Sequence, residues 1–279
     1  MTDAGAPKGW LASNLANWEE RTALHFEAEE YDLTPLRAGQ GALFSIEERE
    51  LPAIKGKRVL HLQCHFGRDS LVLAQRGVQV VGVDFSPTAI ARAQELAAEL
   101  GLQEQAAFHE CNLYDAPDVV PGAGTFDLVF VTWGTIGWLP DIEGWAQVVA
   151  HFLAPGGQLY FADAHPFPLV FDDGAPPLAD GFPGLYAPYM GPALFVDENP
   201  EDYTGDNAAL AGTDYWWDHQ LSEVLNALLT AGLRVEWMHE HDAIPWPIFK
   251  SLVKGEDGMF RWPDKPWLPL SYSILAQKP

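Results

Sequence analysis

Positively charged side chains are scarce in this sequence and missing from its middle. Only 16 Lys and Arg residues accompany 39 Asp and Glu residues, which gives the 279 residues a formal net charge of −23. No Lys or Arg occurs between Arg92 and Arg234. Nucleic acids and anionic membranes are bound through clustered basic side chains, so this composition argues against both kinds of partner. A gain in solubility is the alternative explanation for the acidity.

The sequence also lacks the patterns of several other classes of protein. No apolar run approaches the ~20 residues that a transmembrane helix needs, and no basic-then-apolar segment at the N-terminus predicts a signal peptide. The two cysteines, Cys64 and Cys111, lie inside predicted core elements, which argues against a disulfide framework and favours a cytoplasmic location. No Cys/His spacing indicates a zinc site, and the glycine fingerprint of dinucleotide-binding proteins is absent.

What the sequence does contain is an alternation of strand and helix patterns. Short apolar or β-branched runs predict strands at 58–62, 79–84, 106–110, 126–132 and 158–162. Helices are predicted between them, over 69–76, 86–100 and 142–153. This alternation predicts a Rossmann-like α/β sheet, mostly parallel, with helices on both faces. Ligands bind such sheets beyond the carboxyl ends of the strands.

The chain around this core is less regular. Residues 1–55 predict an N-terminal helical cap, 57–163 the ligand-binding core, and 164–217 an inserted lid rich in proline, glycine and aromatic residues. Residues 218–279 predict a C-terminal helix, at 221–231, and a final pair of strands, at 233–239 and 270–277. We expect these four segments to form a single domain.

Candidate ligand-binding residues follow the first two strands. The turn after the first strand supplies Gln63, Cys64, Gly67 and Ser70. Asp84 ends the second strand about twenty residues on, where a carboxylate can accept hydrogen bonds from both ribose hydroxyls of a nucleotide-like ligand. A helix cap is the alternative for Asp84, but Ser86, followed by Pro87, already fits that position. Phe85 and Ser86 complete the turn.

The next two strand ends add further candidates. Asn112 and Leu113 follow the third strand, and Asn112 either contacts an adenine amine or simply makes a turn. The fourth strand leads into Thr132, Trp133 and Gly134. Gly134 would let the backbone approach a ligand closely, and the ring face of Trp133 would attract a cation by about 0.5–2 kcal/mol. Core filling is the favoured explanation for Trp138.

Four segments of the predicted core share a pattern with a known family. They are VLHLQCHFG at 59–67, GVDFS at 82–86, FDLV at 126–129 and LAPGG at 153–157. Together they resemble the class I S-adenosylmethionine-dependent methyltransferases. The nearer resemblance is to a bacterial small-molecule subgroup with an HLQCHFG first loop, which tends to carry further residues at Trp18, Arg21, His25, Tyr215, Trp217 and His219.

This resemblance implies a single methyltransferase domain, S-adenosylmethionine as cofactor and Trp18 among the cofactor contacts. It does not fix the methyl acceptor, because the fold serves many different methylations. Gln63 and His65 stand where the family has glycines, so the methionine part of the cofactor must be met differently. Asn112 stands where many relatives carry aspartate.

Two histidines flank the predicted lid and are candidate catalytic bases. His165 follows the fifth strand and His219 lies at the far end of the lid. A base commonly contributes ~10²–10⁴-fold to a reaction that moves a proton, although methyl transfer can also proceed by positioning alone. The alternative for both histidines is a structural role.

The lid combines many aromatic residues with no basic one, which predicts a small-molecule acceptor that is neutral or cationic rather than phosphorylated. Two other functions remain open at this point. One is non-catalytic binding of S-adenosylmethionine. The other is a nicotinamide-dependent dehydrogenase, which is disfavoured by the missing glycine fingerprint and by the final strand pair.

Overall fold

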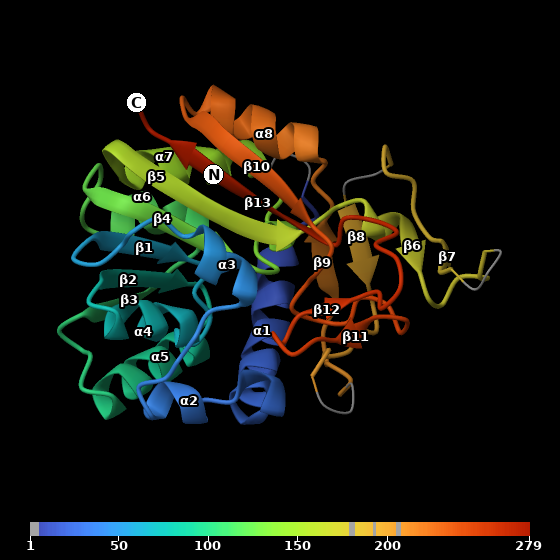
Figure 1. Ribbon diagram of the computed structural model, residues 1–279, viewed down its shortest axis with the longest axis horizontal. Coiled ribbons are helices and arrows are strands. Elements are labelled where there is room, and N and C mark those ends of the chain that lie inside the picture. Colours follow the sequence, from blue (N-terminus) through green and yellow to red (C-terminus); the bar gives the residue numbers. More distant parts are fainter. Residues whose placement is uncertain (1–5, 179–181, 192–193, 205–207) are drawn as a thin grey trace.

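The computed structural model describes residues 6–178, 182–191, 194–204 and 208–279, and its centre is a seven-stranded sheet (Figure 1). The strands follow the order β10-β13-β5-β4-β1-β2-β3. They are β1 (Arg58–Leu62), β2 (Gln79–Asp84), β3 (Ala106–Glu110), β4 (Phe126–Thr132), β5 (Leu153–Ala164), β10 (Arg234–His241) and β13 (Ser271–Gln277). Strand β13 runs antiparallel to both of its neighbours, and all other neighbours are parallel. The predicted Rossmann-like sheet is confirmed.

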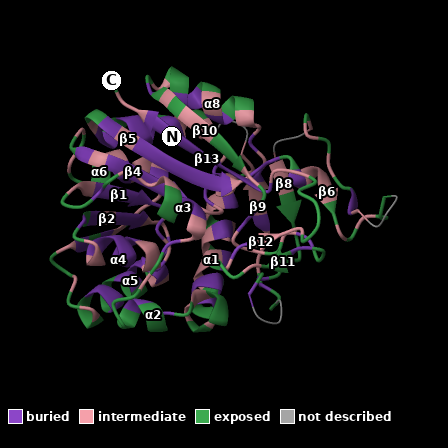
Figure 2. Cartoon of the chain, in the orientation of Figure 1, coloured by how far each residue is buried: buried purple, intermediate pink, exposed green. Residues whose placement is uncertain are grey.

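Helices cover both faces of this sheet (Figures 1 and 2). One face carries α6 (Ala116–Val119), α7 (Ile142–Phe152) and α8 (Leu221–Thr230), and the other carries α4 (Arg68–Gln75) and α5 (Pro87–Glu99). Alternate residues of β4 serve the two layers: Val129 and Val131 pack with the first set, Leu128 and Phe130 with the second. Burial on both faces leaves the carboxyl edge of the sheet as the place for a ligand.

Core boundaries agree closely with the predicted ones. Strands β1 to β4 begin and end at the predicted residues. Helices α4 and α5 differ by one residue at each end, and α7 and α8 end one residue earlier than predicted. Strand β5 is longer than predicted, because Leu153 already pairs with Phe126 of β4, ahead of an irregularity at 154–157 in which Gly156 has a φ angle of +77°. Among the described residues, no helix combines the length and apolar character needed to cross a membrane.

The remaining elements are short apart from the N-terminal helix. The predicted N-terminal cap is broken into α1 (Trp10–Glu27), η1 (Glu29–Tyr31), α2 (Thr34–Arg37) and α3 (Ser45–Glu50). Loops of the core contain η2 (Leu113–Asp115) and η3 (Ile136–Trp138). The inserted segment contains η4 (Pro168–Val170), β6 (Phe171–Asp172), β7 (Gly184–Leu185), β8 (Leu194–Asp197) and β9 (Asp214–Trp217), and the C-terminal connection contains β11 (Val253–Lys254) and β12 (Phe260–Arg261). Strands this short carry too little alternation to be predicted.

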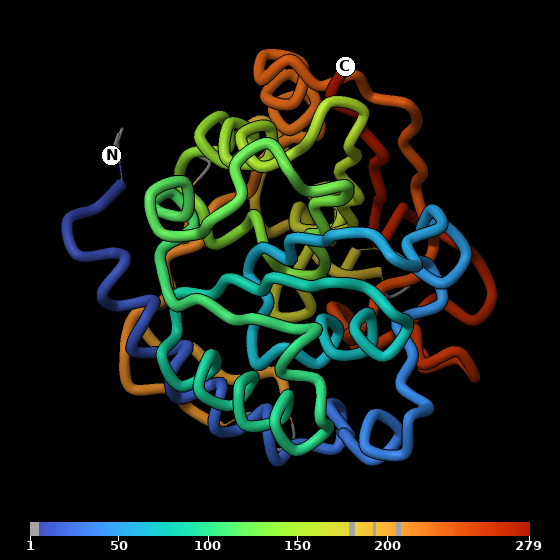
Figure 3. The backbone as a smooth tube through the Cα atoms, turned by 90° about the vertical axis from the view of Figure 1, so that its left-hand side faces the viewer, coloured from blue at the N-terminus to red at the C-terminus, as the bar shows by residue number. Residues whose placement is uncertain are grey.

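The short elements of the inserted segment and of the C-terminal connection gather with α1 beyond the carboxyl ends of the parallel strands, where the arrow of β5 points toward α1, β9 and β12 (Figure 1). Parts of the predicted cap and lid, namely 1–5, 179–181, 192–193 and 205–207, lie outside the described residues. The described parts of the two segments are in direct contact. In Figure 3 the N-terminal helix and the chain around β9 run side by side at the lower left.

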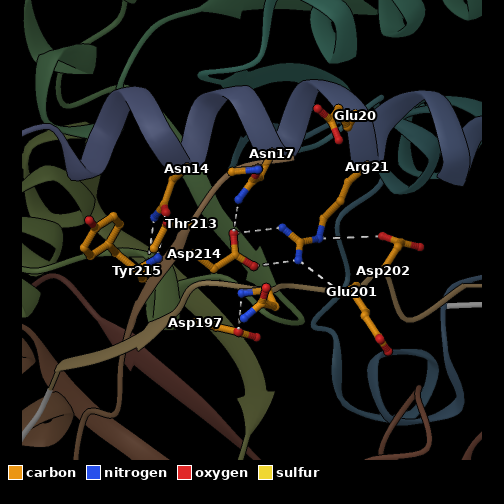
Figure 4. A network of polar contacts seen from close by, with 12 residues as sticks. Asn14, Asn17, Glu20, Arg21, Asp197, Glu201, Asp202, Thr213, Asp214 and Tyr215 are labelled. Atoms are coloured by element: carbon orange, nitrogen blue, oxygen red, sulfur yellow. Dashed lines mark hydrogen bonds and ion pairs between the residues drawn. The ribbon is translucent and has the colours of Figure 1, made fainter. Parts of the chain in front are cut away.

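Polar side chains of α1 join this helix to β9 (Figure 4). The amide of Asn14 donates to the carbonyl oxygen of Tyr215 at 2.7 Å and accepts from the Tyr215 N–H at 2.9 Å. Asn14 therefore pairs with β9 much as a neighbouring strand would. The Ser13 hydroxyl donates to the carbonyl oxygen of Thr213 at 2.7 Å, which extends the contact by one further residue.

An ion pair between Arg21 and Asp214 lies at the centre of this contact. Two guanidinium nitrogens of Arg21 approach the two Asp214 oxygens at 2.6 Å and 3.1 Å, and Asn17 donates to the same carboxylate at 2.8 Å. Arg21 and Asp214 are both 4% exposed. The buried face of α1 is thus largely polar, with Asn14, Asn17, Arg21, Thr22 and His25. A contact made by polar side chains produces no apolar periodicity, so the sequence pattern could not predict it.

Replacing Asp214 with alanine should strongly destabilise the protein. The substitution leaves the Arg21 guanidinium buried without its bidentate partner, a loss worth about 3–5 kcal/mol in the free energy of unfolding. Urea denaturation of both proteins measures it. Asp197→Ala is the matched control, because Asp197 is exposed and faces Asp214 across the β8–β9 pair; it should change stability by no more than about 0.5 kcal/mol. Equal effects of the two substitutions would contradict the assignment.

Candidate functional site

Two adjoining cavities lie at the carboxyl ends of β1, β2 and β4. The larger, called the main cavity below, has a volume of about 350 Å³, within the usual range for small-molecule sites. The smaller, called the side cavity, has a volume of about 40 Å³. Gln63, Asp84, Phe85 and Trp138 line both cavities and so form their common boundary.

The sheet order brings most of the predicted cofactor residues to these cavities. The main cavity is lined by Trp18, Gln63, Cys64, Asp84, Phe85, Thr132, Trp133 and Gly134. The side cavity adds Asn112 and Leu113 from the end of β3. Because β4, β1, β2 and β3 are consecutive in the sheet, the turns that follow them meet at one edge, as the α/β topology requires.

Three predicted cofactor residues instead make contacts within the fold. Gly67 has a φ angle of +76°, and an added Cβ would lie 2.8 Å from an aromatic carbon of β3, so glycine is needed for packing. The Ser70 hydroxyl lies 2.8 Å from Nδ1 of His61. The Ser86 hydroxyl accepts a hydrogen bond from the Ala89 N–H at 3.0 Å, which confirms Ser86 as the N-cap of α5.

The loop after β1 keeps a glycine-like backbone where two glycines are missing. Gln63 and His65 have φ angles of 54° and 52°. This left-handed conformation costs a residue with a side chain on the order of 1–3 kcal/mol. The loop thus has the shape of a glycine-rich turn with two side chains added. The Gln63 amide donates to the carbonyl oxygen of Thr135 at 2.8 Å, while its Oε1 is buried without a partner among the described residues.

The Asp84 carboxylate stands at the boundary of the two cavities. One oxygen accepts the His65 N–H at 2.8 Å, and the other accepts the Ser86 N–H at 3.0 Å. Burial raises the pKa of Asp84 to about 6, against the opposing effect of these backbone hydrogen bonds. Each oxygen can accept a further hydrogen bond, so the carboxylate has capacity for a diol.

Asn112 makes a turn and also faces the side cavity. Its side-chain oxygen accepts the Tyr114 N–H at 3.0 Å, as the turn alternative requires. The same residue lines the side cavity, so a ligand contact remains compatible with the turn. Both alternatives from the sequence therefore survive, and one side chain can serve both purposes.

Buried carboxylates fix the loop after β4. The Trp133 indole N–H donates to Glu47 at 2.5 Å, and burial raises the pKa of this fully buried Glu47 well above its usual value. Asp163 accepts the Gly134 N–H at 2.6 Å and the Thr135 N–H at 2.9 Å. Neither acid was identified from the sequence, because each acts from an element distant along the chain.

The far wall of the main cavity consists of residues that the sequence analysis missed. They are Phe44, Pro245, Trp246, Pro247, Gly258 and Phe260. Trp138, which was assigned to core filling, lines both cavities. Within the described part of the predicted lid, only Tyr203 lines the main cavity. Phe182 of the lid stacks instead on Trp262, with 5.8 Å between ring centres. The Pro-Trp-Pro run at 245–247 was the available signal for this wall.

The two histidines proposed as catalytic bases line neither cavity. His165 is 3% exposed and accepts the Phe167 N–H at Nδ1, 3.0 Å away. His219 is 7% exposed and places Nε2 2.7 Å from the carbonyl oxygen of Leu139. Burial lowers the pKa of both rings. These contacts correspond to the structural alternative for both residues.

A different histidine, His65, does line the main cavity. Its ring centre lies 5.6 Å from that of Trp18, 5.1 Å from that of His25 and 5.8 Å from that of Tyr31. Its Nε2 is buried and has no hydrogen-bond partner within the described chain. Burial, and secondly the neighbouring His25, lowers the pKa of His65 well below its usual value. The ring is therefore neutral at neutral pH.

Comparison with known proteins agrees with this geometry. Residues 59–157 match the model of a methyltransferase domain. The chain is 30% identical over 184 residues to a demethylmenaquinone methyltransferase of Beutenbergia cavernae, which covers 63% of this chain and 68% of that protein. It is 40% identical over 77 residues to a 23S rRNA (uracil(1939)-C(5))-methyltransferase of an Azoarcus species, but this match covers 27% of this chain and only 18% of that protein.

A solved structure shows the same fold. A solved S-adenosylmethionine-dependent methyltransferase from Mesorhizobium loti superposes with a TM-score of 0.58, over 91% of this chain and 99% of that one, at 18% sequence identity. The matched domain contains β1, β2, β3 and β4, whose ends build both cavities. On the sequence match to its relative, this chain belongs to the class I S-adenosylmethionine-dependent methyltransferases.

Proposed function

We propose that this protein transfers a methyl group from S-adenosylmethionine to a small organic acceptor that is neutral or cationic rather than phosphorylated. The observation that carries the proposal is the main cavity, which extends from Asp84 and Gly134 at the strand ends to a wall of aromatic rings. The first part suits a nucleoside-containing cofactor, and the second suits an acceptor with an apolar or aromatic body.

The residues at the strand ends fit the cofactor. Asp84 would hold the ribose, Asn112 and Leu113 of the side cavity would face the adenine, and the β1 loop would meet the methionine part. The buried, unpartnered Oε1 of Gln63 offers an acceptor to an ammonium group. When bound, the cofactor supplies a methyl group on a positively charged sulfur, next to which the faces of Trp18 and Trp133 are favourable surfaces.

Charges around the main cavity support a neutral or cationic acceptor. Three acids line it, Glu30, Asp69 and Asp84, together with two bases, Arg68 and Lys254. Arg68 is paired with Asp69 at 2.5 Å. Lys254 is exposed, and its ammonium lies 5.8 Å from an aromatic ring of the wall. A phosphate usually requires several charge-assisted donors, whereas this cavity offers one lysine outside an ion pair among the described residues.

An RNA acceptor is less compatible with the chain. The net charge of −23 and the absence of Lys and Arg between Arg92 and Arg234 oppose phosphate contacts. The relative named for an rRNA acceptor is matched over 18% of its length, against 68% for the one named for demethylmenaquinone. Free thiols at Cys64 and Cys111 support a reducing compartment such as the cytoplasm.

Substitution of Asp84 tests the cofactor site. Asp84→Ala should weaken the binding of S-adenosylhomocysteine by about 1.5–3 kcal/mol, because it removes a charged hydrogen-bond acceptor. Isothermal titration calorimetry measures the effect, with NAD as the ligand that should not bind. Glu110→Ala is the control, since Glu110 is exposed, lies opposite Asp84 on β3 and lines neither cavity. Tight binding of NAD alone would exclude the proposed function.

The pH dependence of binding tests the same carboxylate independently. Ribose hydroxyls donate to the ionised form, and the pKa of Asp84 in the free protein is about 6. Affinity should therefore be constant above this pH and fall roughly tenfold per unit below it. Titrations at several pH values between 5 and 7.5 measure the slope. Asp84→Asn should abolish the slope, and a wild-type affinity that is constant over the whole range would contradict the ribose role.

A matched set of neutral, cationic, carboxylated and phosphorylated compounds tests the acceptor. Conversion of S-adenosylmethionine to S-adenosylhomocysteine should occur with neutral or cationic members, and its absence with every compound would favour a non-catalytic binding protein. Lys254→Gln should leave the KM of these acceptors unchanged or lower it, because the lysine makes no favourable contact with them. Lys250→Gln is the control on an exposed lysine that does not line the cavity. Preference for phosphorylated compounds, lost in Lys254→Gln, would overturn the charge argument.

A further inference from the structure

Three titratable side chains from distant parts of the chain lie in a row beneath the main cavity. Nε2 of His25 lies 2.9 Å from Oδ2 of Asp202, and both side chains are fully buried. The other Asp202 oxygen accepts hydrogen bonds from the N–H and the hydroxyl of Thr204. Burial acts to raise the pKa of Asp202, but the hydrogen bonds from His25 and Thr204 hold it below its usual value. Asp202 is therefore a carboxylate at neutral pH.

This carboxylate fixes the tautomer of His25. A carboxylate only accepts hydrogen bonds, so neutral His25 must carry its proton on Nε2 and leave a lone pair on Nδ1. That Nδ1 is buried and has no partner among the described residues, and the same is true of Nε2 of His65. The two ring centres are 5.1 Å apart. The two nitrogens are not hydrogen-bonded to each other in the structure, in which the ring planes are tilted by 41°. The spacing of the ring centres nevertheless suits such a bond, because a linear N–H···N hydrogen bond of ~3 Å would place them about 5 Å apart.

We propose that His65 is the general base of the methyl transfer and that His25 and Asp202 hold its ring in the reactive tautomer. A proton on Nε2 of His65 gives the orphan Nδ1 of His25 a donor and leaves the lone pair of His65 on Nδ1. The ring lines the main cavity while Nε2 lies within the cluster, so this lone pair is the one available to an acceptor. The inference rests on the proposed function and names the residue that takes the proton from the methyl acceptor.

The reaction balances with these groups. The acceptor heteroatom forms a bond to the methyl carbon, the carbon–sulfur bond breaks with its electron pair left on sulfur, and the acceptor proton passes to Nδ1 of His65. The resulting imidazolium donates from Nε2 toward His25, whose other nitrogen faces the negative Asp202. Positive charge on His65 is thereby opposed, across the His25 ring, by the buried carboxylate of Asp202, which also lies 3.6 Å from Nε of Arg21.

The surroundings of His65 restrict the other roles it could have. Trp18 of α1, Tyr31 of η1 and Tyr203 of the insertion also line the main cavity on this side. The two tyrosine hydroxyls lie 2.5 Å apart and bond to each other, and burial raises the pKa of both. The Asp84 carboxylate accepts the backbone N–H of His65 rather than its ring. The His65 ring is thus the group of this cluster that can take up a proton from a ligand in the main cavity.

The tautomers can be measured without any acceptor. Imidazole ¹⁵N chemical shifts at pH 7.5 should show the proton on Nε2 in both His25 and His65, with the signals assigned through His25→Gln and His65→Gln. Asp202→Asn should move the proton of His25 from Nε2 to Nδ1. Thr204 would keep its hydrogen bonds to the oxygen of the new amide, so that the amide N–H₂ group would face Nε2 of His25. His65 should shift with it. A proton on Nδ1 of His65 in the wild-type protein, or His65 shifts unchanged in Asp202→Asn, would refute the relay; Asp197→Asn on the exposed β8 strand is the control.

Chemical rescue tests the base directly. His65→Gly suits the left-handed backbone and opens space for one imidazole, so the variant should fold. Its turnover with the acceptor found above should fall by about 10²–10⁴-fold. Its affinity for S-adenosylhomocysteine should change less than ~3-fold, well below the tenfold that 1.4 kcal/mol represents. Added imidazole should restore turnover. Gln63→Gly, at the other left-handed position, should not respond to imidazole.

Two results would overturn the role of His65. One is unchanged turnover in His65→Gly. The other is loss of S-adenosylhomocysteine affinity equal to the loss of turnover with no response to imidazole, which would make His65 a cofactor contact. If the wild-type protein binds S-adenosylhomocysteine but methylates no compound, the proposed function fails, while the tautomer measurement still decides the relay.

Discussion

The buried pair of Arg21 and Asp214 is the contact on which the site depends. It joins α1, which carries Trp18 and His25, to the insertion, which carries Asp202 and Tyr203. A buried ion pair often adds little net stability over apolar packing, since both charges lose their hydration. Its value here is geometric: the bidentate contact sets the position of the helix against the strand, and so closes one side of the main cavity over the ends of β1 and β2.

Sequence patterns were sufficient for the sheet and for the residues that end its strands. Short apolar or β-branched runs and helix caps predicted β1 to β4, and the rule that ligands bind at the carboxyl ends of strands selected Asp84 and Gly134 from the sequence alone. The far wall could not be predicted in this way. Trp246 and Phe260 reach the cavity through an irregular connection, and neither a period nor a motif connects that segment with the β1 loop.

The replaced glycines show the same limit more sharply. The sequence shows that Gln63 and His65 stand at glycine positions, but not that the backbone keeps the glycine conformation. Retaining that conformation with side chains attached costs free energy, and such cost is typically tolerated where it serves a function. His165 and His219 were proposed as bases because they flank the inserted segment. His65 was noted only as a replacement for a glycine in the β1 loop, a position that normally carries no side chain.

The pairing of Asn14 with the backbone of β9 has a consequence for how molecules meet in solution. An unpaired strand edge is a template on which a second chain can add a strand, and proteins commonly protect such edges. Strand β9 belongs to a two-stranded sheet, with β8 on one side. On its other side, side chains of α1 occupy the backbone groups of Thr213 and Tyr215. A helix thus acts as a cover for the sheet edge, and edge-to-edge association through β9 is blocked as long as α1 stays docked.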